Sequence, residues 1–187
     1  MLKDLILKNR SYRRFYQDEV IEMETLHELV DLARLSPSAR NAQPLKYFLS
    51  NTPELNDKIF PHLSWAGYLK DWQGPDKGEQ PAAYIVVLND TDISANYFCD
   101  DGIASQSILL GAVEKGLGGC IIGSLNRLQL QRELRLSDNL KIVHIIAIGK
   151  PKEEVQIEEM NEGNIKYWRD VQKVHHVPKR ELKNIIV

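Results

Sequence analysis

The segment from Arg10 to Phe15 places two or three guanidinium groups and one hydroxyl within five residues, at Arg10, Ser11, Arg13 and Arg14. Arginine makes charge-assisted, often bidentate contacts with phosphate, and a serine hydroxyl adds one more hydrogen bond. The segment therefore suits a phosphate group. A solvated basic segment between two helices is the plainer interpretation, and composition alone favours it.

A second polar segment, from Ser36 to Pro44, stands between a predicted helix and a predicted strand. Its small, amide and proline residues predict a stiff loop with exposed hydrogen-bonding groups. The amides of Asn41 and Gln43 can pair with the donor and acceptor edge of a heterocycle. A loop with ordinary turn chemistry is an equally good interpretation.

Glycine is concentrated between Gly116 and Gly123. The spacing excludes a Rossmann fingerprint, because the third glycine would fall at Ile121 and because the segment follows a helix rather than a first strand. It excludes a P-loop as well, because no Lys-Ser/Thr pair follows Gly123. The pattern indicates a backbone that can approach a flat ligand closely.

Two adjacent histidines, His175 and His176, are followed by Lys179 and Arg180. On an extended segment neighbouring side chains point to opposite faces, so the two imidazoles are poor joint metal ligands. No carboxylate or cysteine partner has suitable spacing, and we expect no metal site. The two cations either supplement a phosphate site or form a solvated end of the chain.

Other catalytic patterns are absent, because no G-x-S-x-G, H-E-x-x-H or C-x-x-C spacing occurs. Asp100 and Asp101 precede a predicted helix, where negative charge favours the N-terminal end of the dipole, so we interpret them as capping residues. Cys99 and Cys120 lack metal-ligand spacing and are expected to be reduced, half-buried thiols. We therefore predict no catalytic acid–base pair.

Interleaved helices and strands must position these residues. Apolar residues over 26–33 have the spacing of a helix core face, and the apolar run over 84–88 is typical of a strand covered on both faces. The helix over 101–115 is apolar around most of its circumference, which predicts a core or interface position. The expected helices cover 2–9, 26–33, 54–60, 101–115 and 128–134, and the expected strands cover 46–49, 84–88 and 142–148.

Length and charge limit the class of protein. The chain has 187 residues, a net charge of −2 and 43% hydrophobic residues, which are ordinary values for one globular domain. They exclude a disordered chain, a disulfide scaffold, a strongly basic nucleic-acid binder and a dehydrogenase with two separate domains. The charged N-terminus and the lack of a long apolar window predict a cytoplasmic protein with no export signal and no membrane contact.

Taken together and in order, the segments resemble the nitroreductase family of FMN-dependent oxidoreductases over about residues 4–151. The family's flavin-phosphate motif is similar to Arg10-Ser11-x-Arg13-x-Phe15. Its second signature, which lines the isoalloxazine ring, is similar to Pro37-Ser38-Ala39-Arg40-Asn41-Ala42-Gln43-Pro44. The loop whose backbone faces the flavin N5 is similar to Gly116-Leu117-Gly118 leading to Ile122-Gly123.

The resemblance implies an α+β nitroreductase-like fold, with a central mixed, mainly antiparallel sheet flanked by helices. It also implies an intertwined homodimer with two FMN sites at its interface. Residues 1–187 would form a single FMN-binding domain, in which residues 152–187 are a C-terminal extension that packs on the partner subunit. The implied cofactor-binding residues are Arg10, Ser11, Arg13, Pro37, Ser38, Ala39, Arg40, Asn41, Gln43, Ile122, Gly123 and, by a looser match, Lys179 and Arg180.

The implied activity is hydride transfer from NADH or NADPH through the flavin N5 to an electron-poor acceptor, such as a nitroaromatic compound or a quinone, by a ping-pong mechanism. A cation near N1 and O2 would favour the reduced flavin anion. Arg40 is the preferred candidate over Lys70, because Arg40 lies inside a matched motif. The main-chain N–H of Gly123 would orient the ring at N5.

Three positions depart from the family pattern. Asn9 stands where many members have another arginine, which leaves more of the phosphate binding to Arg10 and Arg13. Leu45 replaces a frequent tryptophan. Ile122 replaces a frequent glutamate, which should be tolerated because the contact comes from the main chain.

Several alternatives stay open. Trp65, Tyr68 and Trp72 either roof the pocket or form a small satellite core. A specialised flavoenzyme of the same fold, resembling a dehalogenase or a desaturase, would turn over nitro compounds poorly. A flavin-binding module would show no turnover, and a cofactor-free interaction dimer would need all three motifs to be coincidences.

Overall fold

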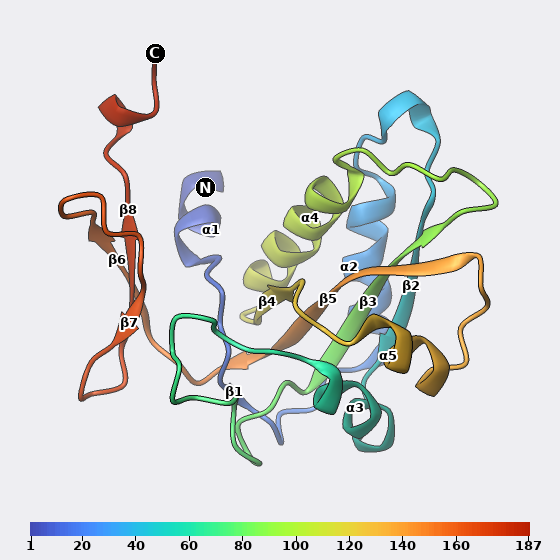
Figure 1. Cartoon of the computed structure of the whole chain (residues 1–187), viewed down its shortest axis with the longest axis horizontal. Helices are drawn as coiled ribbons and strands as arrows, with labels where there is room; N and C mark the ends of the chain where they lie inside the picture. Colours follow the sequence, from blue (N-terminus) through green and yellow to red (C-terminus); the bar gives the residue numbers. More distant parts are fainter.

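Two long antiparallel strands, β3 (Ala83–Asp90) and β5 (Leu140–Pro151), form the middle of the fold in the computed structural model, which describes residues 1–187. Every β3 residue except the last is buried, as predicted for an apolar run covered on both faces. β2 (Leu45–Ser50) pairs with β3, while β1 (Phe15–Tyr16) and β4 (Gly118–Ile122) both pair with β5. All of these pairings are antiparallel, and the order is β1-β5-β3-β2 with β4 beside β5 (Figure 1).

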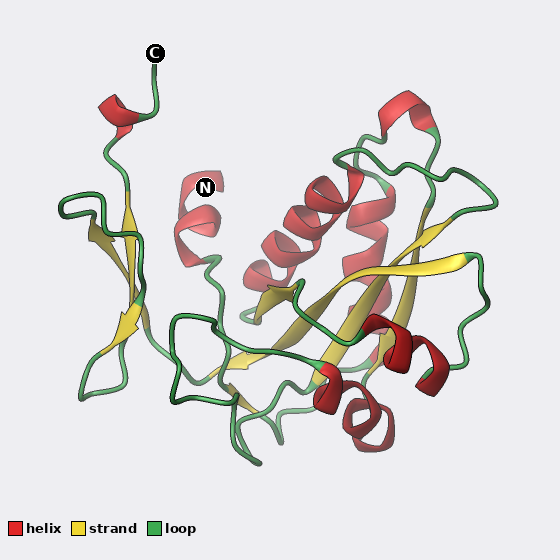
Figure 2. Ribbon diagram, in the orientation of Figure 1, coloured by secondary structure: helices red, strands yellow, loops and turns green.

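Helices cover both faces of the sheet (Figure 2). On one face lie α2 (Met23–Arg34) and α4 (Asp100–Glu114), which share a hydrophobic core with one side of β3. On the other lie α3 (Pro53–Ile59) and α5 (Arg127–Glu133), which share a second core with the opposite side of β3. α1 (Leu2–Lys8) lies against α4. The predicted α+β class and helices are confirmed.

Residues 152–187, here called the C-terminal segment, form a small sheet of their own. Its strands are β6 (Val155–Glu159), β7 (Trp168–Arg169) and β8 (His175–Lys179), in the order β6-β8-β7. β6 and β8 are parallel, which is the only parallel pairing between named strands. A short 3₁₀ turn, η3 (Leu182–Asn184), follows, and the apolar end of the chain is exposed. Docking of that end on a partner stays a prediction.

The glycine-rich segment is a strand rather than a loop. Glycine is required there because the neighbouring chains come too close for a side chain: a Cβ at Gly119 would lie 2.5 Å from the carbonyl oxygen of Ala147 and 2.7 Å from Leu109. Gly118 is similarly crowded by Tyr12 and Pro151. Gly118 and Gly119 therefore serve close packing inside the protein, whereas Gly116 and Gly123 have open space around them.

The cysteines and aromatic residues also differ from expectation. Cys99 is exposed and Cys120 is buried, so neither is half-buried, and both are free thiols. Trp65 is buried in the second core, beside Phe60 and Trp72. Trp65 therefore belongs to a main core of the fold rather than to a separate satellite core. No helix is long and apolar enough to cross a membrane.

Replacing Gly119 by alanine should lower the free energy of unfolding by about 2 kcal/mol, because the new methyl group overlaps backbone that cannot move aside. Gly102→Ala in α4 is the matched control, since a Cβ there meets nothing within 4 Å. It should leave stability unchanged or raise it by up to about 1 kcal/mol. Urea denaturation measures both, and equal effects of the two substitutions would contradict the packing explanation.

Candidate functional site

A cleft of about 330 Å³ lies between the N-terminal segment, β4, α4 and the C-terminal segment. Three of its lining residues are cations, Arg10, Arg13 and Lys179, and none is a carboxylate. Cations that gather in a concave site concentrate positive potential there. The cleft is lined by Asn9, Arg10, Ser11, Arg13, Gln106, Leu109, Gly119, Cys120, Ile121, Tyr167, His175, Val177 and Lys179.

The N-terminal motif enters this cleft because it runs beside β4. Ser11 forms a parallel bridge with Gly119, and the Tyr12 N–H donates to the Gly119 carbonyl at 3.0 Å. Arg10 donates from Nη2 to the Ile6 carbonyl at 2.8 Å, which turns its guanidinium along α1. Its Nε is buried without any partner. An unpaired buried donor on a cation is costly, and an anion in the cleft would satisfy it.

Arg13 is held by its neighbours on one side only. Its Nη1 donates to the Ser11 carbonyl at 3.1 Å and lies 3.3 Å from Nε2 of His175. Its guanidinium lies 5.1 Å from the centre of the Tyr167 ring. The backbone N–H of Arg13 donates to Glu153 at 2.7 Å, and that buried carboxylate pairs with Arg169 at 2.6 Å.

A second hollow of about 160 Å³ adjoins the first and shares Arg13, Cys120 and Ile121 with it. Residues 64–66 and 122–124 complete its wall. Because the Gly119 carbonyl points to the open edge of β4, strand alternation turns the N–H and C=O groups of Ile121 to that same edge. Gly123 follows the strand, and its N–H donates to no backbone carbonyl. The hollow therefore offers main-chain N–H groups to a ligand.

The loop after β4 is fixed from two sides. Arg127 donates from Nη2 to the carbonyls of Gly123 and Val143 at 2.9 and 2.8 Å. The Ser64 N–H donates to the Ser124 carbonyl at 2.9 Å. Ile122 points its side chain into the second core. Residues 122 and 123 are the pair expected to contact the flavin N5. Because the Ile122 side chain points into the core, we expect that contact from the backbone of Gly123.

The C-terminal segment contributes one face of β8. Alternate residues His175, Val177 and Lys179 line the cleft, because side chains two apart share a strand face. Arg180 follows the strand, is exposed and does not line the cleft. Lys179 thus joins the two arginines, and Arg180 does not.

The adjacent histidines point to opposite faces, as predicted, and have opposite charge preferences. Burial, with the charges of Arg13 and Arg169, lowers the pKa of His175 to about 4. His176 contacts Glu158 at 2.6 Å and Asp170 at 3.2 Å, and these hydrogen bonds raise its pKa. No group of three or more His, Cys, Asp or Glu side chains is placed to hold a metal ion.

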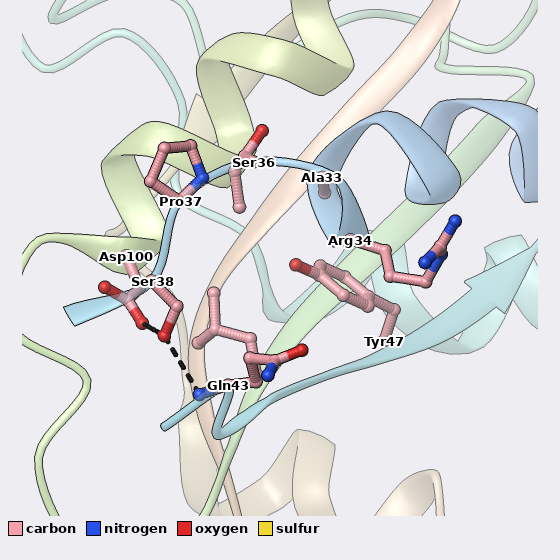
Figure 3. A pocket seen from close by; sticks show the side chains of 10 residues that line it. Ala33, Arg34, Ser36, Pro37, Ser38, Gln43, Tyr47 and Asp100 are labelled. Carbon is pink, nitrogen blue, oxygen red and sulfur yellow. Dashed lines mark hydrogen bonds between the residues drawn. The ribbon is translucent and has the colours of Figure 1, made fainter. Parts of the chain in front are cut away.

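The second motif forms a tightly tied loop containing η1 (Ala39–Asn41). Asp100 accepts from the Ser38 hydroxyl at 2.6 Å and from the Ala39 N–H at 2.9 Å, and the Ser38 hydroxyl accepts from the Gln43 N–H at 2.9 Å (Figure 3). Asp100 and Asp101 lie in the first turn of α4, where their charge favours the helix dipole as predicted, but neither makes a capping hydrogen bond, and Asp100 instead ties the loop to α4. A cavity of about 150 Å³ lies under the loop, beside Tyr47.

Three residues of this loop have left-handed backbone conformations, with φ of 55° at Arg40, 54° at Asn41 and 51° at Gln43. Such conformations cost free energy in residues other than glycine, and they concentrate at functional sites. All three residues are exposed. The loop thus displays side chains and peptide groups that the chain itself leaves uncovered.

One chain does not bring this loop to the cationic cleft. The loop is tied to Asp100 in the first turn of α4, whereas Gln106 lines the cleft, and six residues of helix correspond to about 9 Å. Figure 1 shows the two regions on different sides of α4. Arg40 lies over the Phe98 ring at 5.6 Å, and Lys70 lines another cleft, so neither lies beside Arg10 and Arg13.

Sequence reasoning missed two residues of the site, Tyr167 and His175. His175 was considered only as a metal ligand, although its spacing from Lys179 places both on one strand face. Nothing in the sequence singles out Tyr167, which lines the cleft from the position just before β7. Of the three predicted roof aromatics, Tyr68 packs against Tyr167 with ring centres 4.9 Å apart and the ring planes tilted by 58°.

Comparison with known proteins gives a consistent result. A model of the nitroreductase family matches residues 6–150. A protein of Archaeoglobus fulgidus assigned as an NADH dehydrogenase or NAD(P)H nitroreductase is 27% identical over 158 residues, covering 80% of this chain and 85% of the relative.

Solved structures have the same fold. One from Parabacteroides distasonis, assigned the same activities, is 27% identical with a TM-score of 0.66, over 93% of this chain and 96% of that one. One from Exiguobacterium sibiricum, assigned as a nitroreductase and solved in complex with FMN, is 18% identical with a TM-score of 0.67, over 81% of this chain and 89% of that one.

Asp100→Asn should free the loop at residues 38–43, because an amide keeps only one of the two acceptor oxygens that bind the Ser38 hydroxyl and the Ala39 N–H separately. We expect a loss of about 2 kcal/mol in unfolding free energy, the scale of a hydrogen bond to a charged group, and faster hydrogen exchange at Ala39 and Gln43. Asp101→Asn is the matched control, since Asp101 lies 3.7 Å from His144 and holds no part of the loop. A loop equally mobile in both variants would refute the tether.

His175 and His176 should give opposite pH dependences of stability. Because the pKa of His175 is lowered in the folded protein, the unfolded chain takes up a proton on this residue near pH 6.5 and the folded protein only near pH 4. The stability that neutral His175 contributes is therefore lost as the pH falls toward about 4. The raised pKa of His176 makes its contribution largest at low pH. On acidification from pH 7 to 4, wild type should lose stability relative to His175→Phe and gain it relative to His176→Gln. Slopes of the same sign in urea titrations would exclude this assignment.

Proposed function

Because the chain belongs to the nitroreductase family, we propose that it is an FMN-dependent oxidoreductase that transfers hydride from NADH or NADPH to an electron-poor small molecule, such as a nitroaromatic compound or a quinone, by a ping-pong mechanism. The observation that carries the proposal is the cationic cleft. It contains Arg10, Arg13 and Lys179 without a carboxylate and opens along β4 into a hollow with free peptide N–H groups.

The residues of the cleft fit the phosphate end of FMN. The buried Nε of Arg10 has no hydrogen-bond partner in the protein. The side chain of Lys179 makes no hydrogen bond or ion pair with any other residue of the protein. A phosphate monoester would accept from both of them and from Ser11 and Arg13, giving charge-assisted hydrogen bonds. A neutral ligand would leave these donors unpaired.

The adjoining hollow fits the flavin ring. FMN itself supplies the hydride-transfer chemistry, and the protein supplies binding, orientation and electrostatics. The peptide N–H of Gly123 would orient the ring edge, and the hydrogen bond from Arg127 to the Gly123 carbonyl restrains the next peptide group of the loop. Trp65 and Ala66 close the far wall and exclude water from it.

A second copy of the chain would complete the site, with FMN bound between two subunits. Support comes from the exposed loop at residues 37–43, which carries Arg40, Asn41 and Gln43 and does not reach the cationic cleft of its own chain. We also propose that residues 1–187 act as one FMN-binding unit, with the apolar end of the C-terminal segment packing on the partner. The inner face of that segment packs on its own chain, through Glu153 and His175.

Lys179→Gln should weaken FMN binding about 10- to 100-fold, the scale of one charge-assisted hydrogen bond, and should leave riboflavin binding unchanged because riboflavin has no phosphate. Arg180→Gln is the matched control, since the neighbouring cation lies outside the cleft. Flavin fluorescence quenching measures both dissociation constants. Equal losses in the two variants would place the phosphate elsewhere.

Turnover is tested on the FMN-loaded protein. Anaerobic NADH or NADPH should bleach the bound flavin, and a quinone or nitroaromatic compound should restore its colour. A protein that binds neither FMN nor riboflavin refutes the proposed function. A protein that binds FMN but is not reduced by NADH or NADPH is a flavin-binding module instead.

A further inference from the structure

We infer that His175 is a positioning residue, whose Nε2 accepts a hydrogen bond from Arg13 and thereby aims the free edge of that guanidinium into the cleft. The inference rests on the proposed function for the identity of the ligand. His175 belongs to β8, outside the residues 6–150 that match the family. Its side chain is 1% exposed, and its Nε2 lies 3.3 Å from Nη1 of Arg13.

The contact fixes the tautomer of His175. A guanidinium only donates, so Nε2 must be unprotonated and the ring proton must lie on Nδ1. Nδ1 is buried and has no hydrogen-bond partner. The structure therefore leaves a buried N–H unpaired at Nδ1, while Nε2 meets the arginine. A ring placed for packing alone would have no reason to present its acceptor to Arg13.

The hydrogen bond also orients Arg13. Both contacts on the guanidinium, the Ser11 carbonyl and His175, are made by Nη1. Tyr167 lies against its face and packs on His175 with ring centres 5.0 Å apart. No protein group accepts from Nε or Nη2, so these donors remain for a ligand. Holding the side chain in one rotamer before the ligand arrives removes an ordering cost from binding.

The charge state of His175 supports this role. The elements packed around it bring Arg13, Arg169 and His176 near the ring, and their charges and its burial all oppose protonation. A neutral ring can accept from Arg13, whereas a protonated ring would place a second cation and an N–H donor against it. His175 therefore stays an acceptor at neutral pH.

Two substitutions separate orientation from packing. His175→Phe keeps a ring beside Tyr167 and removes the acceptor, whereas His175→Gln keeps an acceptor near the position of Nε2. For His175→Phe we expect a 5- to 10-fold rise in the FMN dissociation constant, roughly one neutral hydrogen bond. The riboflavin constant should stay within about twofold, because Arg13 acts on the phosphate. His175→Gln should recover most of the FMN affinity.

A double-mutant cycle then tests whether His175 acts through Arg13. In an Arg13→Gln background, His175→Phe should cause no further loss of FMN affinity. Equal loss of FMN and riboflavin affinity, or additive losses in the cycle, would show that His175 only supports the fold and would overturn the inference.

The tautomer can be read without flavin, which separates this inference from the proposed function. Nitrogen NMR of labelled histidine in the flavin-free protein should show His175 protonated at Nδ1 and bare at Nε2 from pH 6 to pH 8. Arg13→Gln should remove that preference. A proton on Nε2 in the wild-type protein would overturn the inference even if FMN binds, whereas failure of FMN to bind would refute only the proposed function.

Discussion

The buried carboxylate of Glu153 joins the two ends of the chain at the candidate site. It accepts the backbone N–H of Arg13 and pairs with Arg169, and its side chain is completely buried. Removing one partner of such a pair typically costs about 3–5 kcal/mol, because the remaining charge stays buried and unpaired. The N-terminal motif and the C-terminal sheet are therefore held in a fixed relation, and the cleft exists because of that relation.

The site lies at the edge of the sheet, where backbone groups are free. β4 pairs with β5 on one side only, and its other edge meets the N-terminal segment at Ser11 and Tyr12 before opening into the hollow beside Gly123. A strand edge normally exposes unpaired N–H and C=O groups that need a partner. Here part of the edge is covered by the chain, and the rest is the surface to which we assign the flavin ring.

The position of each side chain along β8 also decides on which face of the C-terminal sheet its charge lies. Strand alternation in β8 turns His175 and Lys179 inward and His176 outward, where two carboxylates surround it. The face that lines the cleft therefore presents His175 and Lys179, while Glu158 and Asp170, the two carboxylates that contact His176, lie on the other face. Two identical side chains, one residue apart, have pKa values shifted in opposite directions, because one is buried near arginines and the other contacts carboxylates.

The sequence by itself determined the elements and the chemistry of the motifs. Apolar spacing specified α2, α4 and β3, and the order of the arginine, loop and glycine motifs indicated the family, because these signals depend on local periodicity and residue type.

Only the tertiary structure decided the partners of these groups. The sequence placed Asp100 at the start of a helix, but only the fold shows that Asp100 holds the loop at Ser38 and that the glycines at 118 and 119 serve packing. Lys179 was separated from Arg180 by strand alternation, and His175 and Tyr167 reached Arg13 from more than 150 residues away. Such contacts join residues distant in the chain, and no pattern within either segment records which of them will meet.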